Sequence, residues 1–167
     1  ARTRRGLVTL LAACFLVEFA VAVVRLSIQF LGIELGASAM VLGLYGTLSA
    51  GVYGLMSLVS GRASDRFGRR LACLSIALMA AVWLVIGAQK SAYTVLFLLP
   101  VFTAMLAYFW SPVQAWLGDL VSGGRSLNVA LGTFNIVWTA GLMLGPVASG
   151  YLWVRNPYAP FAVGAAI

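Results

Sequence analysis

The chain of 167 residues is 62% hydrophobic and only 9% charged, and its mean hydropathy is +1.01. A soluble domain is nearer half apolar and a quarter charged, so this composition excludes a water-soluble globule. The formal charge of +7 does not indicate a nucleic-acid partner, because the arginines gather at the ends of apolar runs, where they report membrane topology. We therefore expect an all-α integral membrane protein whose surroundings are the lipid bilayer.

Six apolar runs predict the membrane helices. The expected helices cover about residues 7–30, 40–60, 71–88, 93–117 and 127–153, with a sixth from 159 onward. A span needs about 20 apolar residues and only seven residues follow Pro160, so we expect a fragment truncated within its sixth helix. Pro100 and Pro112 are expected to kink the fourth helix.

Basic residues mark alternate connections between these runs. One side of the membrane is expected to hold Arg2, Arg4, Arg5, Arg62, Arg66, Arg69, Arg70 and Arg125. The opposite side has only Lys90 and Arg155 as basic residues. Because the excess of positive charge stays on the cytoplasmic side, we expect a cytoplasmic N-terminus and a location in the inner or plasma membrane.

The starts of the runs repeat along the chain. Leu7, Met40 and Leu71 are followed, at an interval of about 87 residues, by Tyr93, Leu127 and Ala159. A unit of three helices that occurs twice is inserted in opposite orientations, and such inverted repeats are typical of secondary transporters. We expect the first repeat in residues 1–89 and the second in residues 90–167.

Several kinds of chemistry are not expected. The chain has no histidine, which removes the commonest general base and metal ligand. Cys14 and Cys73 lie in separate apolar runs and are interpreted as small buried hydrophobes. Because Glu18 is the only acidic residue inside an apolar run, no paired-carboxylate or metal constellation exists. We expect no enzyme activity, no metal and no other cofactor.

The first run contains a polar stripe formed by Glu18, Arg25 and Gln29. At 3.6 residues per turn these three side chains fall within roughly 40° of one another on the helix. Charges inside a membrane are costly and usually face a water-filled cavity. We interpret Glu18 as the proton-coupling group and Arg25 as its modulator or as an anion ligand. The alternative is a Glu18–Arg25 pair that only tightens packing.

The fifth run divides into two faces. Gly141, Gly145 and Trp138 share the face that we expect to pack on another helix. Asn135 and Thr139 lie further round and are candidates for the cavity, although an intramembrane asparagine serves equally well to join helices.

In the fourth run, Tyr108 and Ser111 are weaker candidates for the cavity. The tryptophans are interpreted as interfacial belt and packing residues rather than as a binding cage: Trp83, Trp110, Trp116 and Trp153.

Residues Gly61–Arg70 form a strongly charged segment, predicted as a turn, between the second and third runs. The segment resembles the signature of the major facilitator superfamily, G-x-L-a-D-r-x-G-r-k, in sequence and in position. The matching residues are Gly61, Asp65, Arg66, Gly68, Arg69 and Arg70, whereas Ala63 replaces the leucine. A second match lies in the fifth run, where Gly141, Gly145, Pro146 and Gly150 resemble the G-x-x-x-G-P-x-x-G-G motif of proton-exchanging exporters, with Ser149 in place of one glycine.

The resemblance implies the N-terminal six-helix half of a twelve-helix transporter, made of two inverted three-helix repeats. The missing C-terminal half would supply the opposite wall of the cavity. Gly61 would let the second helix end against a neighbour, and Asp65 would accept hydrogen bonds at a helix N-terminus of the missing half. Arg69 would pair with Asp119 in a cytoplasmic gate. The alternative is that these arginines only fix the topology.

Together these features predict a secondary transporter that works by alternating access, with a small molecule and protons as its partners. The leading function is proton-coupled export of an amphipathic or drug-like compound. The alternative is uptake or exchange of an organic anion or sugar-like solute, with Arg25 binding the anion. A membrane scaffold is disfavoured because it has no need of charges inside the membrane.

Overall fold

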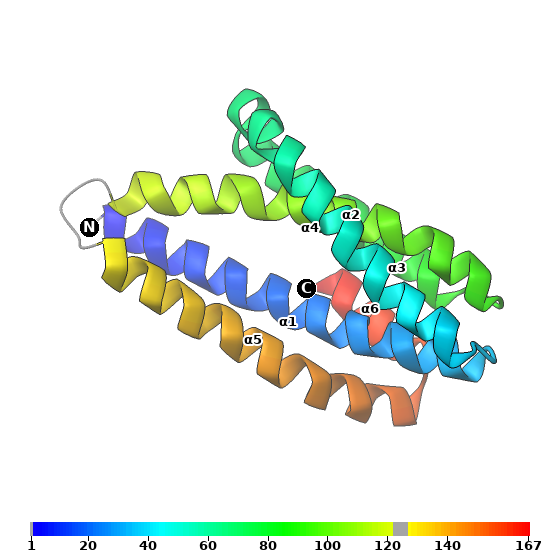
Figure 1. Cartoon of the computed structure of the whole chain (residues 1–167). Helices are drawn as coiled ribbons and strands as arrows, with labels where there is room; N and C mark the ends of the chain where they lie inside the picture. The colour runs from blue at the N-terminus through cyan, green and yellow to red at the C-terminus, as the bar shows by residue number, and fades with distance from the viewer. Residues whose placement is uncertain (1, 122–126) are drawn as a thin grey trace.

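The computed structural model describes residues 2–121 and 127–167 and consists of helices joined by short connections (Figure 1). The helices are α1 (Arg2–Glu34), α2 (Ala39–Phe67), α3 (Arg69–Gly87), α4 (Ala92–Val121), α5 (Leu127–Arg155) and α6 (Ala159–Ala166). The predicted all-α architecture is confirmed. Arg125, which the topology prediction used, lies outside the described residues.

Helix α2 is longer than its apolar run, and the turn predicted over Gly61–Arg70 is wrong. The helix continues to Phe67, and only Gly68 leaves the helical conformation before α3 begins. Gly68 has a φ of 55°, a region that glycine tolerates because it lacks a Cβ atom. Gly61 does not end the helix against a neighbour, since a Cβ atom at this position would meet nothing within 4 Å.

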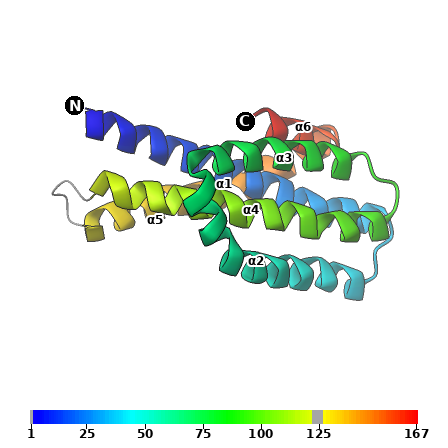
Figure 2. The ribbon, with the colours of Figure 1, turned by 90° about the horizontal axis from the view of Figure 1, so that it is seen from above.

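The first three helices and the last three are arranged as inverted repeats. In Figure 1, α1 and α4 run in opposite directions, as do α2 and α5. Helix α1 packs against α5 and α6, and α4 correspondingly packs against α2 and α3. Figure 2 shows α2 and α3 on the α4 side and α6 near α1. Each repeat therefore contributes its first helix to a cluster completed by the other repeat.

Two serine pairs follow the same symmetry. Ser27 of α1 and Ser149 of α5 are both buried, with hydroxyl oxygens 2.7 Å apart. Ser60 of α2 and Ser111 of α4 form the second pair, with hydroxyl oxygens 2.5 Å apart. Exchanging α1 with α4 and α2 with α5 converts one pair into the other. Because hydroxyl groups in an apolar surrounding need a partner, each pair fixes two helices side by side.

The closest helix contact is between α1 and α5. A Cβ atom built on Gly141 would lie 2.8 Å from the carbonyl oxygen of Phe15, and one on Gly145 would lie 2.9 Å from that of Phe19. These are backbone atoms, which cannot rotate away. Two glycines four residues apart thus let the backbones touch, as small residues do in membrane helix pairs.

The outer surface of the bundle is apolar. Five of the described helices, α1 to α5, are long and apolar enough to cross a membrane. Large hydrophobic side chains project outward from them, with Leu58 78%, Phe97 77% and Val154 88% exposed. Water would penalise such a surface, whereas lipid chains solvate it. The protein is a multi-pass membrane protein.

The two ends of the bundle hold different connections. In Figure 1 the N-terminus lies at the same end as the C-terminal end of α4 and the beginning of α5, and the α1–α2 and α3–α4 connections lie at the other. These two connections lie opposite the N-terminus, as the topology prediction requires of them. The cytoplasmic location of the N-terminus stays a prediction.

Replacing Gly145 with alanine tests the α1–α5 contact. The added methyl group would overlap the backbone of α1, so Gly145→Ala should destabilise the folded protein by about 1–3 kcal/mol. Gly150→Ala is the matched control on the same helix, because its methyl group would meet nothing within 4 Å. The control should be neutral or slightly stabilising, since alanine favours helix over glycine. Thermal unfolding in detergent measures both, and equal effects of the two substitutions would contradict the contact.

Candidate functional site

A cavity of about 580 Å³ lies among α1, α2, α4 and α5. Its volume falls in the range of sites for small molecules. The lining is mostly apolar, with leucines and aromatic rings between a few polar groups. Neither α3 nor α6 contributes a lining residue. The cavity therefore lies between the α1–α5 pair and the α2–α4 pair.

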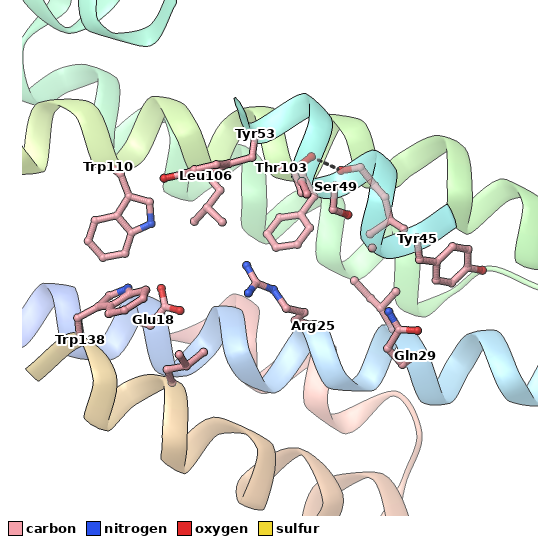
Figure 3. Close-up of a pocket in the computed structure, with 16 residues that line it drawn as sticks. Glu18, Arg25, Gln29, Tyr45, Ser49, Tyr53, Thr103, Leu106, Trp110 and Trp138 are labelled. Carbon is pink, nitrogen blue, oxygen red and sulfur yellow. Dashed lines mark hydrogen bonds between the residues drawn. The ribbon is translucent and has the colours of Figure 1, made fainter. Parts of the chain in front are cut away.

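The polar stripe of α1 faces this cavity. Glu18, Arg25 and Gln29 all line it, and Figure 3 shows their side chains pointing from α1 toward α2 and α4. Glu18 is 3% exposed, whereas the Arg25 side chain is exposed at the open part of the cavity. The structure brings these three predicted residues together.

Glu18 and Arg25 do not form a direct ion pair. No nitrogen–oxygen contact within 4 Å joins Glu18 to Arg25, so Arg25 acts on Glu18 only as a neighbouring charge. Both charged groups are thus open to the cavity. This geometry disfavours the interpretation in which the two residues form a pair only for packing.

Trp138 of α5 lines the cavity together with Glu18. Its indole lies beside the carboxylate (Figure 3). Trp138 is partly buried against the core and lies beside Glu18 of α1, so it accompanies Gly141 and Gly145 on the side of α5 that faces α1. Three residues separate Trp138 from Gly141, which turns the indole by about 60° from the contact with α1. The glycines bring α5 close to α1, and Trp138 then reaches around to Glu18.

The other predicted cavity residues lie elsewhere. Asn135 and Thr139 are exposed on α5 and are absent from the lining. Tyr108 is half-buried outside the cavity, and Ser111 is hydrogen-bonded to Ser60. A cavity role for Asn135 and Thr139 stays a prediction.

The tryptophans divide between packing and the cavity. Trp83 is 3% exposed, and its ring meets that of Phe102 edge to face at a centroid distance of 5.7 Å. This is a packing role, in agreement with part of the prediction. Trp110 also packs in the core, edge to face on Phe134 at a centroid distance of 5.9 Å, and in addition it lines the cavity (Figure 3).

The sequence analysis did not predict a row of polar cavity residues on α2. Tyr45, Ser49 and Tyr53 line the cavity opposite the α1 stripe, and Thr103 joins them from α4 (Figure 3). The hydroxyl of Tyr45 donates to the carbonyl of Ala92 at 2.7 Å, which ties the beginning of α2 to that of α4. The three α2 residues are four positions apart, which places their side chains on one face of the helix. This spacing is the sequence pattern from which the polar face of α2 could have been predicted.

The charged segment between α2 and α3 lies outside the cavity. Asp65, Arg66 and Arg70 are exposed. The Arg69 guanidinium lies 4.4 Å from the ring centre of Trp116 on α4, an arrangement in which the cation is attracted to the aromatic face. Asp119 follows Trp116 by about one turn of α4. The structure thus brings Arg69 to the end of α4 where its predicted partner lies.

The α5 motif residues lie on two faces. Gly141 and Gly145 are buried against α1, and Ser149 continues that face with its bond to Ser27. Pro146 is exposed, and Gly150 has open space around its Cα atom. The serine that departs from the motif therefore adds a hydrogen bond at the helix contact.

The apolar exterior, the inverted repeats and the cavity with charged groups between them define a membrane transport protein built on the plan of a secondary transporter. The family model described as Major Facilitator Superfamily matches residues 9–167. The chain therefore belongs to the major facilitator superfamily, whose members are transporters rather than enzymes. Its six helices have the arrangement of one half of that fold. No solved structure gives a significant match to the chain.

Cysteine labelling tests whether water enters the cavity. With Cys14 and Cys73 replaced by alanine, Ser49→Cys should react with a hydrophilic maleimide, because residue 49 lines the cavity. Leu78→Cys is the matched control, since Leu78 is 43% exposed on α3 but outside the cavity, where lipid excludes the reagent. Equal reactivity of the two cysteines in membranes would show that the cavity has no special access to water.

Proposed function

We propose that this secondary transporter exchanges protons for an amphipathic small molecule and exports the compound. The single observation that supports this proposal is the position of Glu18. The Glu18 residue is 3% exposed, and it lines the cavity without a direct ion pair to Arg25. An acidic group inside a membrane marks an ion or substrate pathway, because its charge is costly unless it is neutralised.

Proton exchange at Glu18 follows from the free-energy cost of a charged carboxylate inside the membrane. A proton neutralises the carboxylate, and so does the positively charged part of a substrate, which makes the two ligands compete. The other charged or titratable lining residues are Arg25 on the same helix and Tyr45 and Tyr53 on α2. Glu18 is the one carboxylate among these lining residues, and a carboxylate is the group suited to exchange a proton for a cation.

Uptake or exchange of an organic anion is the second candidate function. Arg25 supports it, because its guanidinium lines the cavity and has no direct ion pair with Glu18. Binding that requires an anionic group on the solute and is lost in Arg25→Ala would favour this candidate.

Alternating access requires a second wall and a gate. We assign the wall to a second six-helix unit that closes the open side of the cavity, where Arg25 is exposed. The gate is assigned to the segment from Gly61 to Arg70, which is joined to α4 through the Arg69–Trp116 contact. The exposed Asp65 carboxylate is available to a helix N-terminus of that second unit.

Removing the Glu18 charge tests the proton exchange. Glu18→Gln keeps the size and polarity of the side chain but cannot ionise. Transport driven by a proton gradient into proteoliposomes should fall to the level of empty vesicles, while binding of a neutral substrate is retained. Glu34→Gln is the matched control, since Glu34 is exposed at the end of the same helix. Gradient-driven transport at the native rate in Glu18→Gln would refute the proposal.

A separate substitution tests the gate. Asp65→Asn should slow transport at least tenfold and leave membrane insertion unchanged, because the carboxylate is exposed and contributes little to folding. Asp119 is unsuitable as a control because it belongs to the same predicted gate. Glu34→Gln is again the matched control, because Glu34 is an acidic residue at the other end of the bundle. Undiminished transport by well-inserted Asp65→Asn protein would remove Asp65 from the gate.

A further inference from the structure

The cavity contains one charge of each sign. Glu18 and Arg25 are the only lining residues with formal charges, and the other polar lining groups are hydroxyls, one amide and indoles. Its net charge is therefore zero when Glu18 is ionised. A ligand with a single charge would satisfy one of the two groups and leave the other without a counter-ion in an apolar cavity, which is unfavourable.

The two charges are held apart along α1. Seven residues separate Glu18 from Arg25, which corresponds to about 10 Å along the helix axis. Figure 3 shows the guanidinium in the space between the helices, inclined toward the Glu18 end of the cavity but not in contact with the carboxylate. Since no direct ion pair joins them, the gap between the charged atoms exceeds 4 Å. Part of a ligand can therefore lie between the two groups.

The surroundings of the two charges differ. Trp110 and Trp138 line the cavity at the end where Glu18 lies. Indole faces attract cations, so this end of the cavity suits an ammonium group. Arg25 lies near Gln29 and Ser49, where a carboxylate could accept hydrogen bonds from several donors. Phe102 and Leu106 provide the apolar surface that the rest of the ligand would cover.

We propose that the cavity binds a zwitterion whose ammonium and carboxylate groups are separated by an apolar or aromatic body. The ammonium pairs with Glu18 between the two indoles, and the carboxylate pairs with Arg25. This proposal rests on the proposed transport function and narrows its substrate class. It also joins the two candidate functions, because the cation site and the anion site then belong to a single ligand.

Three matched probes test the proposal. The zwitterion is 4-(aminomethyl)benzoic acid, its methyl ester carries only the cation, and its N-acetyl derivative carries only the anion. Binding to the full-length protein in nanodiscs is measured by calorimetry. The zwitterion should bind at least tenfold more tightly than either derivative, since a hydrogen bond to a charged group contributes about that factor. Equal or tighter binding of a derivative, or no binding of the zwitterion at millimolar concentration, would overturn the proposal.

Substitutions assign each end of the zwitterion. Arg25→Gln should weaken zwitterion and N-acetyl probe binding at least tenfold and leave the methyl ester unchanged. Glu18→Gln should weaken the zwitterion and the methyl ester and leave the N-acetyl probe unchanged. Glu34→Gln and Arg5→Gln are the matched controls on α1, because both residues are exposed and outside the cavity. If both cavity substitutions weaken binding of all three probes equally, Glu18 and Arg25 do not pair with separate charges of the ligand and the proposal is wrong.

Failure of the transport proposal would give a different result. Proton-driven transport of the methyl ester by native protein, combined with no preference for the zwitterion, would retain the transporter proposal and overturn the zwitterion. Selective zwitterion binding without any response to a proton gradient would retain the ligand class and overturn proton exchange.

Discussion

The contact between the backbones of α1 and α5 determines how the cavity is built. Gly141 and Gly145 allow α5 to approach within backbone contact of Phe15 and Phe19, and the Ser27–Ser149 hydrogen bond extends the contact toward the ends of both helices. On α1 the polar stripe lies roughly a quarter turn from this contact. Once α5 is in place, Glu18 and Arg25 are directed away from lipid and toward α2 and α4.

The inverted repeat explains why the cavity lies between two helix pairs. The Ser60–Ser111 pair joins α2 to α4 as the Ser27–Ser149 pair joins α1 to α5, and the two pairs are exchanged by the repeat symmetry. Strong contacts within each pair leave the space between the pairs for Glu18, Arg25 and their aromatic neighbours. A site between repeats is the location in which secondary transporters bind their substrates.

The sequence was sufficient to predict the membrane helices and the polar stripe, because both depend on local periodicity. It was insufficient for Gly61–Arg70, since charged residues end a hydrophobic run without ending a helix, and only Gly68 has the required backbone conformation. The cavity position of Trp138 was not predicted, because only the placement of α1 against α5 decides which side chain of α5 lies beside Glu18. The cavity positions of Tyr45, Ser49 and Tyr53 were not predicted, because the many small residues of α2 obscured their regular spacing.

Proton release on substrate binding tests the central claim, that Glu18 exchanges a proton for substrate, most directly. Full-length protein in a weakly buffered solution with a pH indicator would be mixed with a transported substrate. The account predicts that the native protein releases protons and that Glu18→Gln releases none, because the substrate displaces the proton from this carboxylate alone. Undiminished proton release from a Glu18→Gln variant that still binds substrate would contradict the account and place the exchange at another group.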